Sequence, residues 1–197
     1  GKAKKDQVVY RNTAKQGDIV CVTGDLGSAY VGLQVLEREK QEFLVNKEMQ
    51  PQLDSFEYVI SRQLRPKARM DVIYELAELG ILPTSMIDIS DGLASEILHI
   101  ATQSALGAVI YEDKLPIDKQ TYDICINDFK LSPLTCAMNG GEDYELLFTI
   151  DQNDYEKLKL HDDISFIGFM QPTEKGVNLI SRQKQIVPIQ AQGWKSF

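Results

Sequence analysis

Apolar residues follow two different spacings along this chain. Short β-rich runs predict strands, and the four clearest are "IVCVTG" (19–24), "SMIDIS" (85–90), "GAVIYE" (107–112) and "YELLFTI" (144–150). The last of these is almost continuously apolar, which predicts burial on both faces. Apolar residues at helical spacing predict helices in "LGSAYVGLQVLEREK" (26–40), "RMDVIYELAELG" (69–80), "DGLASEILHIATQ" (91–103) and "IDKQTYDICINDF" (117–129). Strands alternating with helices predict a layered α/β (α+β) domain with a mixed sheet packed against helices.

Less regular stretches complete the predicted secondary structure. Near the start, Val8–Arg11 has the composition of a short strand, and residues 46–62 are expected to form a loop and then a helix near Ser55. Asp151 is placed to cap a helix that follows it. Three closing strands are predicted in "ISFIGFM" (164–170), "GVNLIS" (176–181) and "QIVPI" (185–189).

Composition and charge narrow the function classes. The chain has 197 residues, of which 43% are hydrophobic, enough for one domain with a sizeable core. Its net charge of −8 repels phosphate backbones, so we expect no nucleic acid partner. No apolar run reaches the roughly 18 residues that a membrane span needs, so we expect no membrane partner. The basic first residues lack the apolar core of a signal peptide, which favours a cytoplasmic protein.

Three cysteines, Cys21, Cys125 and Cys136, lie in apolar surroundings. No two of them have the spacing of metal ligands. We therefore expect buried, reduced thiols, in keeping with a cytoplasmic protein.

Two aspartates stand where a predicted strand becomes a helix, in "MIDISDGLASEILHI" (86–100). Ser90 or Asp91 can cap that helix, which accounts for one acid. Asp88 lies on or beside an apolar strand, where a carboxylate is costly unless it is paired, exposed or bound to a cation. Asp88 and Asp91 offer the oxygen ligands that Mg²⁺ prefers, and a helix N-terminus can bind phosphate oxygens. From the spacing alone, the cap and the metal site both remain open.

A second acidic string, "NGGEDYELLF" (139–148), combines paired glycines with Glu142, Asp143 and Glu145 before a buried strand. Taken alone, it is explained by a solvated turn. Two acid-rich turns, each at the edge of an apolar element, favour a functional site instead. A third string, "VTGDLGSAYVGL" (22–33), could face a phosphate or simply form a tight strand–helix connection.

Taken together, these strings resemble the thiamine-monophosphate kinases, members of the aminoimidazole ribonucleotide synthetase and selenophosphate synthetase superfamily. In order along the chain, the matching strings are "RNTAKQGDIVCVTGDLGSAYVGL" (11–33), "LRPKAR" (64–69), "MIDISDGLASEILHI" (86–100), "NGGEDYELLFT" (139–149) and "GWKSF" (193–197). The resemblance implies the layered C-terminal domain of that superfamily. It also implies transfer of the γ-phosphoryl group of ATP onto thiamine monophosphate, giving thiamine diphosphate with the help of Mg²⁺.

The resemblance also implies roles for particular residues. Carried over by position, Asp88 and Asp91 would hold Mg²⁺, Arg11 and Ser90 would contact ATP, and Glu142 and Trp194 would contact thiamine monophosphate. The aromatic face of Trp194 suits a cationic ring. From the residues alone, Arg11 is equally an ordinary surface arginine and Trp194 a packing residue. Asp143 is expected to do no more than hydrogen-bond within its own turn.

The family's N-terminal domain has no counterpart in this sequence. We therefore expect residues 1–16 to be a leader from the end of a missing N-terminal ATP-binding domain, and residues 17–197 to be the C-terminal kinase domain. The resemblance implies that the parent protein is a homodimer formed through the missing domain, and that the isolated chain is inactive. The alternatives are a non-catalytic nucleotide- or phosphate-binding module and a sister activity of the same superfamily.

Overall fold

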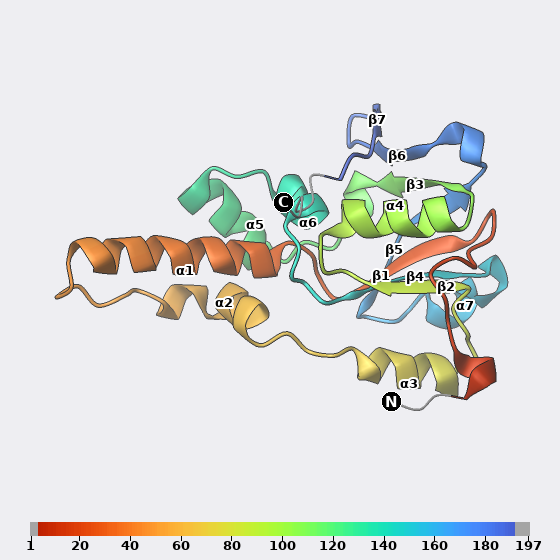
Figure 1. Ribbon diagram of the computed structural model, residues 1–197, viewed down its shortest axis with the longest axis horizontal. Helices are drawn as coiled ribbons and strands as arrows, with labels where there is room; N and C mark the ends of the chain where they lie inside the picture. The colour runs from red at the N-terminus through yellow and green to blue at the C-terminus, as the bar shows by residue number, and fades with distance from the viewer. Residues whose placement is uncertain (1–3, 192–197) are drawn as a thin grey trace.

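A seven-stranded sheet forms the centre of the computed structural model, which describes residues 4–191. The strands are β1 (Ile19–Thr23), β2 (Ser85–Asp88), β3 (Gly107–Tyr111), β4 (Leu146–Ile150), β5 (Ile164–Gln171), β6 (Val177–Ile180) and β7 (Ile186–Pro188). Their order is β2-β4-β1-β5-β3-β6-β7 (Figure 1). The β3–β6 pair is parallel and the other neighbouring pairs are antiparallel. The prediction of a mixed sheet in an α/β fold is thus confirmed.

Helices follow the strands in most connections. The α-helices are α1 (Ser28–Val45), α2 (Glu57–Leu64), α3 (Met70–Glu78), α4 (Leu93–Gln103), α5 (Lys119–Ile124), α6 (Pro133–Asn139) and α7 (Tyr155–Leu158). Short 3₁₀ turns occur at Lys5–Gln7, Asp54–Phe56, Glu112–Lys114, Gln152–Asp154 and Thr173–Lys175, and a π turn at Cys125–Phe129. Within residues 4–191, no helix is both long and apolar enough to cross a membrane.

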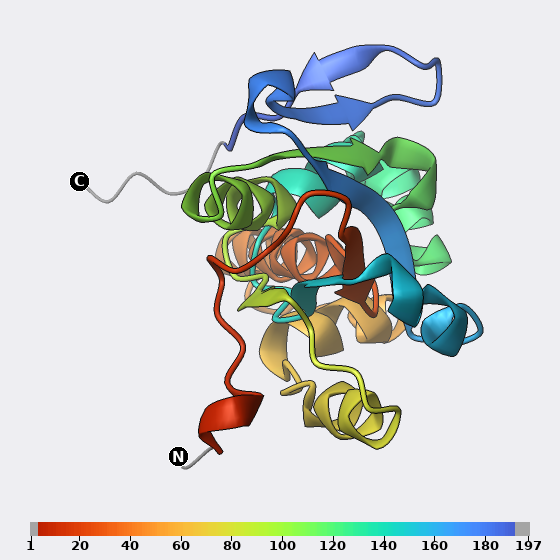
Figure 2. The same ribbon diagram turned by 90° about the vertical axis from the view of Figure 1, so that its right-hand side faces the viewer.

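The helices cover both faces of the sheet. Helices α4 and α6 contribute to the apolar cluster on one face, and α3 and α7 to the cluster on the other (Figure 2). Leu147 and Phe148 are adjacent in β4, fully buried, and belong to these two different clusters. Because successive residues of a strand point to opposite faces, β4 is buried on both sides, as predicted.

Helices α1 and α2 lie side by side and extend beyond the sheet (Figure 1). Gly32 permits this close contact, because a Cβ at that position would lie 2.0 Å from the carbonyl oxygen of Val59. The three cysteines are free and buried, which confirms that part of the prediction for the thiols.

Two predicted elements differ from the observed ones, and one observed helix was not predicted. The segment Val8–Arg11 is not a strand, because a single hydrogen bond, from the Met86 N–H to the Tyr10 carbonyl (3.3 Å), joins it to β2. The helix expected over 117–129 ends as α5 at Ile124 and continues only as a π turn. Helix α6 was not predicted, although its start carries a recognisable signal, a serine cap followed by proline at the first helical position.

Candidate functional site

The two acid-rich strings lie against each other through their backbones. The Glu142 N–H donates to the Ser90 carbonyl (2.8 Å), and the Tyr144 N–H donates to the Ile89 carbonyl (2.8 Å). In return, the Ile89 N–H donates to the Glu145 carbonyl (2.7 Å). These bonds extend the antiparallel pairing of β2 with β4 beyond the ends of both strands. Residues 52 to 56 positions apart in sequence thereby become neighbours.

Two glycines make this pairing sterically feasible. Gly92 has φ 102°, and a Cβ there would lie 2.8 Å from the Met138 carbonyl oxygen. Gly141 has φ 72°, and a Cβ there would lie 2.7 Å from the Ser90 carbonyl oxygen. Each glycine thus combines a left-handed backbone with a close approach that no other residue tolerates without displacement.

The side chains of the second acidic turn alternate between solvent and interior. Glu142 and Tyr144 are exposed and have positive φ values of 63° and 52°, which is uncommon outside glycine. The Tyr144 hydroxyl donates to the Glu142 carboxylate (3.1 Å). This hydrogen bond, together with the charges of Glu142, Asp88 and Asp91, raises the pKa of Tyr144. The exposed acids of both turns are therefore close enough to act on one phenol.

Asp143 points inward and caps α1. Its carboxylate accepts hydrogen bonds from the backbone N–H groups of Gly27 (2.8 Å) and Ala29 (3.3 Å). The expectation that Asp143 bonds only within its own turn is therefore wrong. Burial raises the pKa of Asp143 to about 7, against these hydrogen bonds, which lower it. The glycine-bearing turn at 22–33 thus has its N–H groups directed at a carboxylate, so a tight strand–helix connection explains it better than a phosphate site does.

Glu145 also points inward, where it meets two arginines. Its carboxylate lies 2.8 Å from Arg62 Nη1 and 2.5 Å from Arg69 Nη1, and it accepts a hydrogen bond from the Thr23 hydroxyl. Neither arginine was predicted from the sequence to have a role. Arg69 could have been noticed, because it ends the "LRPKAR" string.

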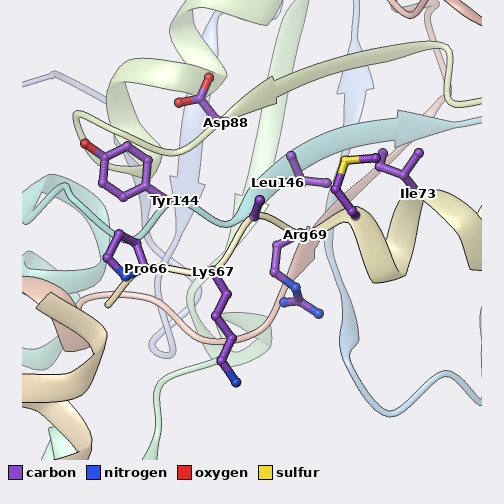
Figure 3. A pocket seen from close by; sticks show the side chains of 9 residues that line it. Pro66, Lys67, Arg69, Ile73, Asp88, Tyr144 and Leu146 are labelled. Atoms are coloured by element: carbon purple, nitrogen blue, oxygen red, sulfur yellow. The ribbon is translucent and has the colours of Figure 1, made fainter. Parts of the chain in front are cut away.

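A cavity of about 400 Å³ adjoins the paired turns (Figure 3). Asp88 and Tyr144 border it from the acidic turns, and Leu146 lies between them and the opposite wall. That wall is the linker from α2 to α3 together with the start of α3, namely Pro66, Lys67, Ala68, Arg69, Met70 and Ile73. The charged ends of Lys67 and Arg69 point away from Asp88 (Figure 3). The cavity is therefore mostly apolar, with a carboxylate at its rim.

The residues present fit a divalent cation beside Asp88 and Asp91. Both side chains are exposed at the paired turns. Beneath them on α4, the Glu96 side chain accepts from the Asp91 N–H (3.2 Å), while its buried Oε2 atom has no hydrogen-bond partner. Burial, and to a lesser extent the charges of Asp91 and Asp88, raises the pKa of Glu96 to about 7. Three carboxylates in such proximity are an arrangement that a cation would stabilise.

The protein alone does not complete a metal-binding cluster there. Among residues 4–191, no group of three or more Asp, Glu, His and Cys side chains is already gathered in metal-binding geometry. An incomplete set of protein ligands such as Asp88 and Asp91 suits Mg²⁺, which is usually held by one or two carboxylates together with phosphate oxygens and water. Glu96 was not predicted to belong to the site, although it lies three residues after Leu93 and four before Ile100, on the apolar face of the predicted helix.

The remaining predicted site residues differ in how closely they approach this place. Ser90 lies between the two aspartates and is partly exposed. Arg11 is exposed in a turn directly after Tyr10, whose carbonyl is bonded to β2, the strand that carries Asp88. Trp194 lies outside the described residues. The structure thus brings Asp88, Ser90, Asp91 and Glu142 together and leaves the prediction for Trp194 as it was.

Comparison with known proteins places this chain among related sequences. The family model for "AIR synthase related protein, C-terminal domain" matches residues 15–158. The thiamine-monophosphate kinase of Buchnera aphidicola subsp. Schizaphis graminum is 38% identical over 183 residues, which are 90% of this chain and 52% of that protein. The thiamine-monophosphate kinase of Aquifex aeolicus is 33% identical over 193 residues, 98% of this chain and 56% of that protein.

Solved structures agree with the sequence relatives. The structure described as "AaThiL complexed with AMPPCP and TMP" has a TM-score of 0.77 and 31% sequence identity, covering 96% of this chain and 54% of that one. This chain therefore spans about half the length of the relatives it matches. Because the family model covers most of the chain, and the fold agrees with it, the chain belongs to the family of AIR synthase related proteins, as their C-terminal domain.

Proposed function

We propose that this chain supplies the C-terminal half of the active site of a thiamine-monophosphate kinase. The reaction is transfer of the γ-phosphoryl group of ATP onto the phosphate of thiamine monophosphate, which yields thiamine diphosphate and ADP. The observation that carries the proposal is the backbone pairing of the two acidic turns, since it gathers Asp88, Asp91 and Glu142 beside a cavity. The similarity to thiamine-monophosphate kinases over 90% or more of this chain supports the choice of substrate.

Phosphoryl transfer between two phosphates needs positioning and charge neutralisation more than covalent chemistry. Asp88 and Asp91 would hold Mg²⁺, which, when bound, neutralises charge on the phosphate oxygens. The Ser90 hydroxyl, between these aspartates, would donate a hydrogen bond to ATP, and Arg11 would contribute positive charge to its phosphates. Glu142, held outward by its left-handed backbone, would contact thiamine monophosphate, as would Trp194.

The domain organisation is part of the proposal. Residues 1–16 would be the end of an N-terminal ATP-binding domain, and residues 17–197 the C-terminal kinase domain. The half-length coverage of the relatives supports this division. The parent protein would be a cytoplasmic homodimer joined through the N-terminal domain.

The proposed substrate is tested by direct detection of the product. The full-length protein is incubated with Mg-ATP and either thiamine monophosphate or unphosphorylated thiamine, and the products are separated by chromatography. We expect thiamine diphosphate from thiamine monophosphate and no phosphorylation of thiamine. Phosphorylation of thiamine at a comparable rate would contradict the proposed acceptor, and ATP binding without transfer to either compound would favour the non-catalytic alternative.

A further inference from the structure

The linker between α2 and α3, residues 65–69, forms one wall of the cavity that Asp88 and Tyr144 border from the other side (Figure 3). Residues 65–68 are exposed. In the part of the chain that the structure describes, residues 66–68 make no hydrogen bond to the sheet. Backbone with so few contacts opens readily unless a neighbouring group holds it. The shape of the cavity therefore depends on what anchors this linker.

Arg69 is the anchor at the end of the linker. Its side chain is only 8% exposed, and its guanidinium reaches the Glu145 carboxylate at 2.5 Å. It also contacts the carboxylates of Asp71 and Asp163. Burial by itself would lower the pKa of Arg69, but its bonds to Asp71 and Glu145 raise the pKa above its ordinary value. The guanidinium is thus fixed by three carboxylates from three segments of the chain.

Glu145 links this anchor to the paired acidic turns. Its side chain is 2% exposed and is held by Arg62 and Thr23 as well as by Arg69. Its backbone carbonyl accepts a hydrogen bond from the N–H of Ile89, in the segment between Asp88 and Asp91. One residue therefore binds the linker through its side chain and the turn with the two aspartates through its backbone.

We propose that Glu145 and Arg69 are a positioning pair for the phosphate acceptor. The pair holds residues 65–69 at a fixed distance from Asp88 and Tyr144, so that the cavity keeps the width that the ring part of the acceptor requires. The apolar walls, which include Leu146, suit a flat heteroaromatic ring. The Asp88 carboxylate at the rim would then lie toward the phosphate end of the acceptor, where the transfer takes place. This inference rests on the proposed function, because it assigns the acceptor of that reaction to the cavity.

The pair can be tested with two substitutions of Arg69 in the full-length protein. Arg69→Met removes the charge and keeps a long, unbranched side chain. Arg69→Lys keeps the charge but loses the forked geometry of the guanidinium. The matched control is Arg38→Met, since Arg38 pairs with Glu39 (3.0 Å) on α1 and does not line the cavity. We expect Arg69→Met to raise the KM for thiamine monophosphate by about tenfold or more, with the KM for ATP and kcat changed less than about threefold. Arg69→Lys should recover part of the loss.

Hydrogen exchange provides a second readout that does not depend on turnover. In Arg69→Met, the hydrogen-bonded amides at the two ends of the linker, Arg65 (to the Ser61 carbonyl) and Ile73 (to the Arg69 carbonyl), should exchange faster than in the wild type, whereas in Arg38→Met they should not. A folded Arg69→Met protein with wild-type KM values would overturn the positioning role, as would equal losses in both KM values and kcat. Unchanged exchange would show that the pair does not hold the linker. A third outcome separates the two proposals. If exchange is faster in Arg69→Met as expected, but the wild-type protein does not phosphorylate thiamine monophosphate, the proposed function and the acceptor assignment are refuted and the anchoring itself is supported.

Discussion

The backbone N–H of Glu142 donates a 2.8 Å hydrogen bond to the carbonyl of Ser90. This bond joins two turns that carry separate acidic strings, and it places an acid proposed to meet the acceptor beside the pair proposed to hold Mg²⁺. Neither turn could be displaced without moving the other. The geometry of the whole site therefore depends on backbone contacts that glycine makes possible.

Gly141→Ala should disrupt this pairing. The new Cβ would lie 2.7 Å from the Ser90 carbonyl oxygen, on a backbone with φ 72°. We expect a loss of stability above the roughly 1 kcal/mol that a left-handed alanine costs by itself, and a loss of turnover of about a hundredfold. Gly80→Ala is the matched control, because Gly80 has φ 66° and no atom within 4 Å of the added Cβ. Equal denaturation midpoints and turnover in the two variants would show that the turns do not need this contact.

Asp91→Asn tests the metal assignment. The substitution keeps the shape of the side chain and removes the charge that a divalent cation requires. We expect turnover of the full-length protein to fall by about a hundredfold or more, with an unchanged circular dichroism spectrum. Asp113→Asn, in the turn after β3 and outside the paired turns, is the control. Turnover at the wild-type level in Asp91→Asn would contradict the proposal that Asp91 holds Mg²⁺.

Glu142→Gln tests which substrate this residue meets. Glu142 is exposed, and a glutamine oxygen can still accept the hydrogen bond that the Tyr144 hydroxyl donates. The substitution should therefore leave the fold intact. We expect the KM for thiamine monophosphate to rise by about tenfold, and the KM for ATP by much less. Initial-rate measurements that vary each substrate in turn would check this. An equal rise in both KM values would instead indicate a shared role in holding Mg²⁺.

Asp143→Asn should change how stability depends on pH. Burial raises the pKa of Asp143 from its ordinary 3.8 to about 7, with the charge of Arg62 opposing the rise and that of Asp25 adding to it. Between about pH 4 and pH 7 the folded protein thus keeps a proton that the unfolded chain has released, so the wild type loses stability as the pH rises through this window.

The asparagine variant keeps an oxygen that can accept from the Gly27 N–H and has no charge to desolvate. Its free energy of unfolding should therefore decrease less than that of the wild type between pH 4 and pH 7, by at most about 4 kcal/mol. Urea unfolding at several pH values would measure the difference. Parallel curves for the two proteins would mean that Asp143 titrates normally in the fold.

The sheet and its principal helices could be predicted because their residues follow regular spacings. For β4 the signal was an almost continuous apolar run, from which its burial on both faces could be inferred. The segment Val8–Arg11 has the composition of a strand but makes only one bond to β2. Whether a short β-rich run forms a strand depends on the partner it meets, which its own residues do not specify.

The candidate site was predictable only in part. The acidic strings marked Asp88, Asp91 and Glu142, but nothing in their spacing revealed that the two turns pair through their backbones. Asp143 and Glu145 stand on either side of Tyr144 in one short string, yet Asp143 caps α1 and Glu145 binds two arginines. Such partners are distant in sequence, so their roles follow from the tertiary structure alone.

The most direct test of the central claim compares the full-length protein with the chain of residues 1–197 in one assay. Both are incubated with Mg-ATP and thiamine monophosphate, and thiamine diphosphate is measured directly. We predict that the full-length protein forms thiamine diphosphate and that residues 1–197 alone do not, because this chain would supply only half of the site. Formation of thiamine diphosphate by the isolated chain would contradict the half-site proposal. Absence of thiamine diphosphate from both reactions would contradict the proposed kinase activity.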